Sequence, residues 1–431
     1  MQYMWQWRLF GSPDRVLEDG RRVRILNPGL INHSSGPDFF NAMLEIDGMR
    51  WGGNVELHVR ASDWHRHGHH LDKSYDSVIL HVVGVSDTFV TRTDGSSIPQ
   101  LQLPFSAETA DRYRFLVQGA QPIRCHAWIR DVPALHKRNW LTRAGMERLE
   151  QKSDRILDYV RQTTGEWNQA VFIALARALG FGTNSEPFEL LGRSLPLNIV
   201  AKHANSLFQL EALLIGQAGL LQETELDQYG RQLLDEYTFM AHKYSLRPLE
   251  RHIWKFSGTR PANMPHRKLA LLARLLQQHS AGLCSAVIDA QGDLERLLTL
   301  LSVKFDGYWA RHFNFGPTAD RDYSSALSPA MARVVVLNVA APLYRAYGQY
   351  MCQPELEELA VDLWEKLPAE RNSVVRLWED AAGLKAANAF ESQALLHIRR
   401  AYCDPHKCLQ CRLGHRLLRQ TTPAHRPTPS K

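Results

Sequence analysis

Two carboxylates and a histidine near the start of the chain have the types and spacing of a metal-dependent hydrolytic site. Asp38 follows Gly36-Pro37 and precedes one apolar stretch, and Glu56 and His58 stand two apart in the next. Residues two apart on a β-strand share one face of the sheet. Carboxylate oxygens suit Mg²⁺ or Mn²⁺, which keeps waters that can attack a phosphodiester. We therefore predict that Asp38 and Glu56 hold the ion and that His58 orients or deprotonates water, the three forming a catalytic set.

Histidine is concentrated in the same region. Of the 19 histidines, seven lie between residues 33 and 81: His33, His58, His65, His67, His69, His70 and His81. Histidine is the commonest metal ligand and a common proton carrier. We predict His65, His67 and His69 as further metal ligands that assist the site; contact with phosphate and a surface loop without function are the alternatives. His81 lies in an apolar stretch and is expected to be a hydrogen-bonded core residue.

Three cysteines near the C-terminus form a second candidate metal site. Cys403, Cys408 and Cys411 fall within nine residues, and His415 stands four residues beyond Cys411. Three thiolates and one imidazole make a tetrahedral zinc set, so we predict zinc with His415 as the fourth ligand, or His406 in its place. The spacing C-x4-C-x2-C also occurs in iron–sulfur proteins with a distant fourth cysteine. That fourth ligand would come from Cys125, Cys284 or Cys352. A third interpretation is that Cys403, Cys408 and Cys411 bind no metal.

Composition narrows the class of protein. The chain has 431 residues, 44% hydrophobic and 22% charged, which is typical of a folded globular protein with more than one domain. The net charge is +6, but residues 399–431 carry eight Lys or Arg against one Asp. Such a basic segment can attract phosphate backbones, so nucleic acid is the expected partner, with a solvated tail as the alternative. Six cysteines without a disulfide framework, no signal sequence and no membrane-length apolar run predict a cytoplasmic protein without a membrane partner.

The elements that must position these residues change in character along the chain. Short alternating stretches predict strands over residues 23–26, 42–46, 51–59 and 78–83, with a hairpin turn at Asp47-Gly48. A second hairpin is expected over residues 88–103, and a short helix or loop over 63–76. Helical spacing begins near Val132. The main helical stretches expected are Ile199–Leu221, Leu226–Tyr244, His266–His279, Leu283–Val303, Glu355–Lys366 and Ala389–Tyr402.

This pattern predicts an α+β protein: an α+β domain over residues 1–105, a helical domain over 106–420 that carries the cysteines, and a disordered tail over 421–431. Pro37-Asp38 and Glu56-Leu57-His58, on an expected α-β-β-β-α-β order, resemble the PD-(D/E)XK nuclease superfamily. The resemblance covers about residues 1–105 and implies a Mg²⁺-dependent nuclease domain. The chain departs from the superfamily pattern at His58, where a lysine is usual.

The chain as a whole also resembles an uncharacterised bacterial family of unknown function. The residues that carry this resemblance are Asn32, Gly36–Phe39, Gly53–His58, Ser62–Trp64, Leu80–Val83, Ile215–Gly219, Ser392–Leu396 and Tyr402-Cys403. This resemblance brings no activity with it. Three hypotheses follow: a metal-dependent nuclease, a non-enzymatic adaptor built on a degenerate nuclease-like domain with structural zinc, and a metal-dependent hydrolase of a small molecule.

Overall fold

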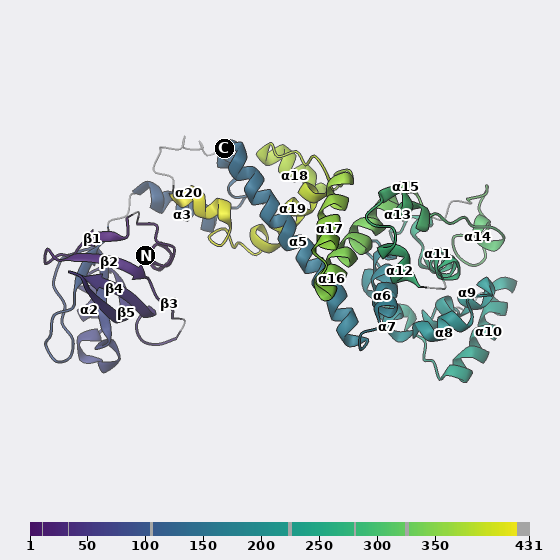
Figure 1. Cartoon of the computed structure of the whole chain (residues 1–431), viewed down its shortest axis with the longest axis horizontal. Helices are drawn as coiled ribbons and strands as arrows, with labels where there is room; N and C mark the ends of the chain where they lie inside the picture. Colours follow the sequence, from purple (N-terminus) through teal and green to yellow (C-terminus); the bar gives the residue numbers. More distant parts are fainter. Residues whose placement is uncertain are drawn as a thin grey trace. The chain divides into compact units, whose positions relative to one another are not determined.

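The fold is given by a computed structural model that describes residues 1–10, 12–32, 34–103, 107–222, 226–279, 282–323 and 327–419. The chain divides into two compact units (Figure 1). The first contains Met1–Ile129 and the described chain from Tyr402 onward, and the second is Arg130–Ala401. The cysteine segment therefore belongs to the same unit as the N-terminal sheet. The predicted tail, residues 421–431, lies outside the described residues.

The first unit is built around a mixed seven-stranded sheet. The strands are β1 (Asp14–Val16), β2 (Arg22–Asn27), β3 (Leu30–Ile31), β4 (Phe39–Ile46), β5 (Met49–Arg60), β6 (Val78–Val85) and β7 (Gln100–Gln102). Their order is β1-β2-β4-β5-β6-β7, with β3 beside β4. The pairs up to β4-β5 are antiparallel, whereas β6 runs parallel to both β5 and β7. The predicted α+β class is confirmed.

The two hairpins expected from the sequence have different outcomes. Ile46 pairs with Met49 across Asp47-Gly48, and both turn residues have positive φ, as a two-residue hairpin turn requires. The second hairpin is reduced to an isolated bridge from Thr91 to Ser97. The side chains of Val90 and Ile98 are instead buried with Trp64, and Gln100–Gln102 extends the sheet as parallel strand β7.

The two faces of the sheet have different coverings. One face carries an apolar core that includes Trp5 of α1 (Gln2–Gln6), Ile25, Leu44, Val55 and Val82. The other side of β5 and β6 faces the segment between these strands, which forms α2 (Asp63–Arg66) and two 3₁₀ turns (His69–Leu71 and Lys73–Tyr75). The unit is completed by α3 (Ala107–Gln118), α4 (His126–Ile129) and α20 (Arg412–Arg419). α20 packs beside α3 although nearly 300 residues separate them (Figure 1).

The second unit is helical, as predicted. Its α-helices are α5 (Ala134–Gln162), α6 (Trp167–Leu179), α7 (Ser185–Ser194), α8 (Leu197–Lys202), α9 (Leu207–Gln217), α10 (Gln228–Tyr244), α11 (Pro265–Gln278), α12 (Leu283–Ile288), α13 (Leu294–Leu300), α14 (Tyr308–Arg311), α15 (Pro329–Val335), α16 (Ala341–Met351), α17 (Pro354–Lys366), α18 (Ser373–Ala382) and α19 (Ala389–Ile398). Two π-helical segments, Val336–Ala340 and Arg399–Cys403, continue α15 and α19. Between residues 150 and 400, the part that the structure describes has no β-strand beyond two isolated bridges.

Two long helical stretches expected from the sequence are interrupted by caps. The stretch 199–221 breaks where the Ser206 side chain accepts a hydrogen bond from the Gln209 amide at the start of α9. The stretch 283–303 breaks where Asp293 caps α13 in the same way. A side-chain oxygen at this position satisfies an amide that has no partner within the helix. None of the helices in the described part of the chain has the length and apolar character needed to cross a bilayer.

Candidate metal centre

Strand register places four polar side chains on one face of the sheet. Glu56 and His58 stand two apart on β5, His81 of β6 is paired with Glu56, and Gln100 of β7 is paired with His81. All four are buried, with 6% or less of each residue exposed. Buried polar groups persist in a folded protein when they are hydrogen-bonded or serve a site. The predicted pairing of Glu56 and His58 on one face therefore extends over three neighbouring strands.

Asp38 and Glu56 hold each other in place. The Asp38 amide donates to Oε2 of Glu56 over 2.9 Å, and the Leu57 amide donates to Oδ2 of Asp38 over 3.1 Å. The other oxygen of Asp38, Oδ1, accepts a hydrogen bond from the Gln2 side chain at 2.5 Å. Both Asp38 oxygens are thus engaged by the protein, whereas Oε1 of Glu56 points toward the histidines. Through its backbone amide, Asp38 therefore positions the carboxylate of Glu56.

A chain of hydrogen bonds sets the protonation of the two buried histidines. The Gln100 amide group donates to the carbonyl of Thr88 over 2.9 Å, so its Oε1 must be the atom that faces Nδ1 of His81 at 3.0 Å. His81 Nδ1 therefore carries the proton, and its Nε2 accepts from Nδ1 of His58 over 2.8 Å. The lone pair of His58 is left on Nε2, the nitrogen that faces the cluster. Ligating histidines are commonly fixed by a partner on their second nitrogen in this way.

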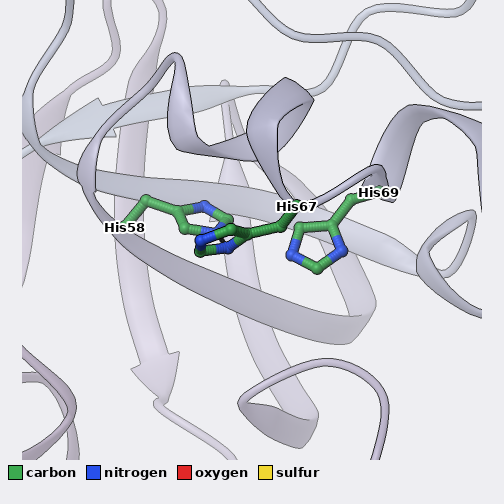
Figure 2. Close-up of side chains that lie close together, drawn as sticks. All are labelled: His58, His67 and His69. Atoms are coloured by element: carbon green, nitrogen blue, oxygen red, sulfur yellow. Dashed lines mark hydrogen bonds between the residues drawn. The ribbon is translucent and has the colours of Figure 1, made fainter.

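Two further histidines reach His58 from the segment after β5. Nδ1 of His67 lies 3.2 Å from Nε2 of His58, and the ring of His69 lies 5.3 Å from the His58 ring, centre to centre. Gly68, with φ of +77°, reverses the chain between them, so that both can face the same point. The ring of Tyr75 stacks on His69 at 3.8 Å and supports it from behind. Figure 2 shows the three imidazoles side by side.

These distances fit one ion. One ligand atom each of His58, His67 and His69 lies within 4.8 Å of the others. Oε1 of Glu56 is 3.7 Å from Nε2 of His58 and 3.5 Å from Nε2 of His69. Two nitrogens that bind one tetrahedral zinc ion are about 3.3 Å apart. The separation of 3.2 Å between His58 and His67 matches that value, so the residues fit a divalent ion held mainly by imidazole nitrogens.

Burial sets the charge of the cluster. Burial, with the nearby imidazoles of His81, His69 and His67, lowers the pKa of His58 to about 3. Burial is also the main cause that lowers the pKa values of His69 and His81, each to about 4. Burial and the charge of Asp38 raise the pKa of Glu56 to about 8. Neutral imidazole is the form that binds metals, so His58 and His69 are in the ligating state at neutral pH, whereas Glu56 is mostly protonated there.

The remaining predicted ligands lie elsewhere. His65 is exposed on α2, and its ring packs against His70 at 4.8 Å, outside the cluster. Among the described residues, the group His58, His67 and His69 is the one set of three or more His, Cys, Asp or Glu with ligand atoms that close together. No three of Cys403, Cys408, Cys411 and His415 therefore have ligand atoms within 4.8 Å of one another. The sequence analysis did not predict roles for Gln100 and Tyr75. The register of β7 places Gln100 beside His81, and the path of the segment between β5 and β6 places Tyr75 against His69.

A comparison with protein families identifies the chain at the level of family. The family model described as protein of unknown function (DUF2851) matches residues 1–373. The chain belongs to this family. The matched region contains the histidine cluster and ends before the cysteine segment. Searches of curated proteins and of solved structures found no match.

Proposed function

We propose that the first unit of this DUF2851 protein is a metal-dependent phosphodiesterase that acts on nucleic acid. The observation that carries the proposal is the convergence of His58, His67 and His69, with Oε1 of Glu56 within 3.7 Å of two of them, His58 and His69. The ion then lies among the histidines and not between Asp38 and Glu56. Imidazole ligands suit Zn²⁺ and related transition metals better than Mg²⁺, which prefers oxygen. Zinc is therefore the expected ion, and Mn²⁺ the expected substitute.

The side of the cluster at His67 is open to solvent. His58 is buried and His69 partly buried, but His67 is exposed. Three protein ligands and an open position are the arrangement of catalytic zinc sites, whereas structural sites are closed by four ligands. An ion held there supplies a Lewis acid that lowers the pKa of water and polarises a phosphoryl oxygen. The exposed side is where a substrate phosphate can enter.

Glu56 has the position of a general base. Its Oε2 is fixed by the Asp38 amide, while Oε1 faces the imidazoles at 3.5–3.7 Å. In the proposed hydrolysis, which requires the ionised form of Glu56, water attacks phosphorus, its proton passes to Oε1 of Glu56, and the bond from phosphorus to the leaving oxygen breaks. Because the pKa of Glu56 is about 8, this form becomes more abundant as pH rises through that value. The proton on Glu56 then returns to the leaving oxygen. Asp38, His81 and Gln100 are positioning residues.

Two features of the same unit support a phosphodiester as the substrate. The elements run α1, β1, β2, β3, β4, β5, α2 and β6, which contains the α-β-β-β-α-β order that the nuclease resemblance implies with two short strands, β1 and β3, in addition. α20 carries Arg412, Arg416 and Arg419 and has no Asp or Glu. Cations on one helix attract a phosphate backbone. Together they favour nucleic acid over a small molecule.

The test measures metal content and turnover on matched variants. The full chain, loaded with Zn²⁺, Mn²⁺ or Mg²⁺, is incubated with labelled single-stranded DNA, duplex DNA and RNA, with EDTA as the blank. We expect cleavage with Zn²⁺ or Mn²⁺, and Glu56→Gln to lower the rate at least 100-fold while bound zinc stays near one per chain. His67→Ala should lose both zinc and activity. His65→Ala, on the same segment but outside the cluster, should keep both.

A non-enzymatic adaptor is the second candidate, and the distances of Glu56 favour it. Oε1 is near enough to both His58 and His69 for Glu56 to close the site as a fourth ligand. A closed site is structural, and the unit would then bind its partner without turnover. In that case Glu56→Gln weakens zinc binding, and no substrate is cleaved with any of the three metals. This pair of results would replace the hydrolase with the adaptor.

A further inference from the structure

A row of cations lies along one side of α5 in the helical unit. Arg148, Lys152 and Arg155 are spaced four and three residues apart, so their side chains are neighbours on the helix surface. Arg148 and Lys152 are partly buried, whereas Arg155 is exposed. The row therefore runs from the packed part of the helix to solvent.

Helix α19 brings a fourth cation to the same side. Nε of Arg148 donates to Oε1 of Gln393 over 3.2 Å. Nε2 of His397 lies 3.3 Å from Oε2 of Glu147, another residue of α5. Gln393 and His397 thus mark the face of α19 that meets α5. Arg400 stands three residues after His397, is exposed, and extends this face.

Both π-helical segments of the described chain contribute to this region. Arg400 belongs to the segment that continues α19. In the segment that continues α15, Oδ1 of Asn338 accepts a hydrogen bond from the Lys152 amine. Nδ2 of Asn338 donates to the Val334 carbonyl over 2.7 Å, which keeps Oδ1 turned toward Lys152. π-Helical turns are rare and occur frequently at functional sites, so their presence here favours a binding role.

The four cations carry more positive charge than neighbouring acids offset. We call them the basic cluster: Arg148, Lys152, Arg155 and Arg400. Among the described residues, no carboxylate oxygen lies within 4.0 Å of a side-chain nitrogen of any of them. Glu370, the acid whose charge acts on the cluster, accepts a hydrogen bond from the Gln393 side chain. The basic cluster therefore keeps a net positive charge.

Hydrogen-bond donors are also left over at the basic cluster. An ammonium group has three donors and a guanidinium group has five. Within the part of the chain that the structure describes, Lys152 gives one hydrogen bond, to Asn338. Arg148 gives two, to Gln393 and Gln151. The oxygens of a bound phosphate would accept the remaining ones.

Burial and mutual repulsion disfavour the charged forms of the two partly buried members. Burial and the charges of Arg400 and Arg155 lower the pKa of Arg148 to about 10. Burial lowers the pKa of the Lys152 amine, and the charge of Arg148 adds to this effect. Glu370 opposes both shifts without cancelling them. An anion beside the two groups stabilises their charged forms, so the cations are suited to a negatively charged ligand.

We propose that the basic cluster binds a phosphate of a nucleic-acid backbone. A guanidinium group pairs with two phosphate oxygens at once, and an ammonium group adds a compact charge. This site lies in the second unit and is separate from the histidine cluster. The phosphate site stands on its own contacts, but the choice of nucleic acid as the source of the phosphate rests on the function proposed above.

The test measures binding without turnover. The full chain is titrated in EDTA against a fluorescent single-stranded oligonucleotide, and anisotropy is followed at several salt concentrations. Arg155→Gln, Arg400→Gln and Lys152→Met should each weaken binding about 5-fold or more and lower the salt slope by about 0.7. The control is Arg143→Gln, which removes an exposed arginine from the other side of α5 that is paired with Glu147 at 2.8 Å. It should change neither quantity.

Two further probes distinguish the sources of the phosphate. An oligonucleotide of the same sequence with an uncharged methylphosphonate backbone should bind equally to the unaltered protein and to Arg155→Gln. Inorganic phosphate, added at constant ionic strength, should displace the charged oligonucleotide only weakly. Tight binding of inorganic phosphate without any binding of the oligonucleotide would overturn the assignment to nucleic acid. Unchanged affinity and salt slope in all three cluster variants would overturn the phosphate site itself.

One variant separates this inference from the function proposed for the first unit. His67→Ala, which should abolish cleavage, is expected to bind the oligonucleotide as tightly as the unaltered protein does. Binding that depends on the basic cluster, in a protein that cleaves nothing, would support this site and refute the nuclease. Cleavage that continues while the cluster variants bind normally would do the reverse.

Discussion

Nε2 of His81 accepts a hydrogen bond from Nδ1 of His58 over 2.8 Å, and this one contact decides which nitrogen of His58 faces the cluster. The Thr88 carbonyl sets the orientation of Gln100, and Gln100 sets the tautomer of His81. The ligating lone pair on β5 is therefore determined by a backbone carbonyl shortly after β6. A buried polar chain of this kind is fully satisfied only in one arrangement.

Replacing His81 should weaken metal binding without removing a ligand. His81→Phe keeps a ring of similar size but leaves Nδ1 of His58 without its acceptor, so the His58 ring loses its fixed tautomer. Loss of such a partner lowers metal affinity by about 10–100-fold. The measurement is competition for Zn²⁺ with a chromophoric chelator.

The matched control for this prediction is His203→Phe. His203 is a buried histidine of the second unit that is also hydrogen-bonded on both nitrogens, to Gln209 and Tyr244. Its replacement should leave the affinity for Zn²⁺ unchanged. Equal zinc affinity in His81→Phe and the unaltered protein would show that His81 does not position His58.

Part of the site could be predicted from the sequence and part could not. A period of two places Glu56 and His58 on one face whatever the sheet order is, and the histidine-rich segment indicated where further ligands come from. Gln100 depends on β7 running parallel to β6, a pairing that no local pattern specifies. The roles of His65 and His67 could not be separated either. The two residues are of the same type, and the path of the segment after β5 decides which of them faces His58.

The turn between His67 and His69 depends on Gly68. Its φ of +77° and ψ of 13° lie in the left-handed region, and a Cβ would meet nothing within 4 Å. Gly68→Ala should therefore cost about 1 kcal/mol of unfolding free energy through backbone strain alone, measured by urea unfolding with a chelator present. Because the strain is relieved by moving His67 and His69 apart, zinc affinity should fall as well.

Gly52→Ala provides the comparison for Gly68→Ala. Gly52 is exposed on β5, its φ lies outside the left-handed region, and a Cβ there also meets open space. Its substitution should change the unfolding free energy by less than about 0.5 kcal/mol. Equal effects of the two substitutions would contradict the assignment of strain to Gly68.

The helical unit offers a test of close packing between α9 and α10. A Cβ at Gly216 would stand 2.1 Å from Cγ of Tyr237, so the ring lies directly on the glycine. Gly216→Ala should destabilise the protein by about 1–3 kcal/mol, the usual cost of overpacking. Because Tyr237→Leu removes the ring, the double variant should lose at least about 0.5 kcal/mol less than the sum of the two single variants. Strict additivity in urea unfolding would refute the contact.

The last prediction concerns the pH dependence of stability. Glu211 of α9 is buried, and its Oε2 accepts hydrogen bonds from Tyr229 and Trp309, each at 2.7 Å. Burial raises its pKa from 4.5 to about 7, although both hydrogen bonds oppose the shift. Between these values the folded state binds more protons than the unfolded state, so this group lowers stability as pH rises through the window. The full effect is reached above pH 7 and amounts to about 3 kcal/mol.

Glu211→Gln removes the charge and keeps an acceptor for both donors. The variant should therefore match the unaltered protein at pH 4.5 and exceed its unfolding free energy by up to about 3 kcal/mol at pH 8, measured by urea unfolding across this range. Glu365→Gln, at an exposed position of α17, removes a charge without any such burial and should show no comparable trend. A difference between Glu211→Gln and the unaltered protein that stays constant from pH 4.5 to 8 would mean that Glu211 does not titrate in this window. Its buried carboxyl would then be held in one charge state by Tyr229 and Trp309 throughout.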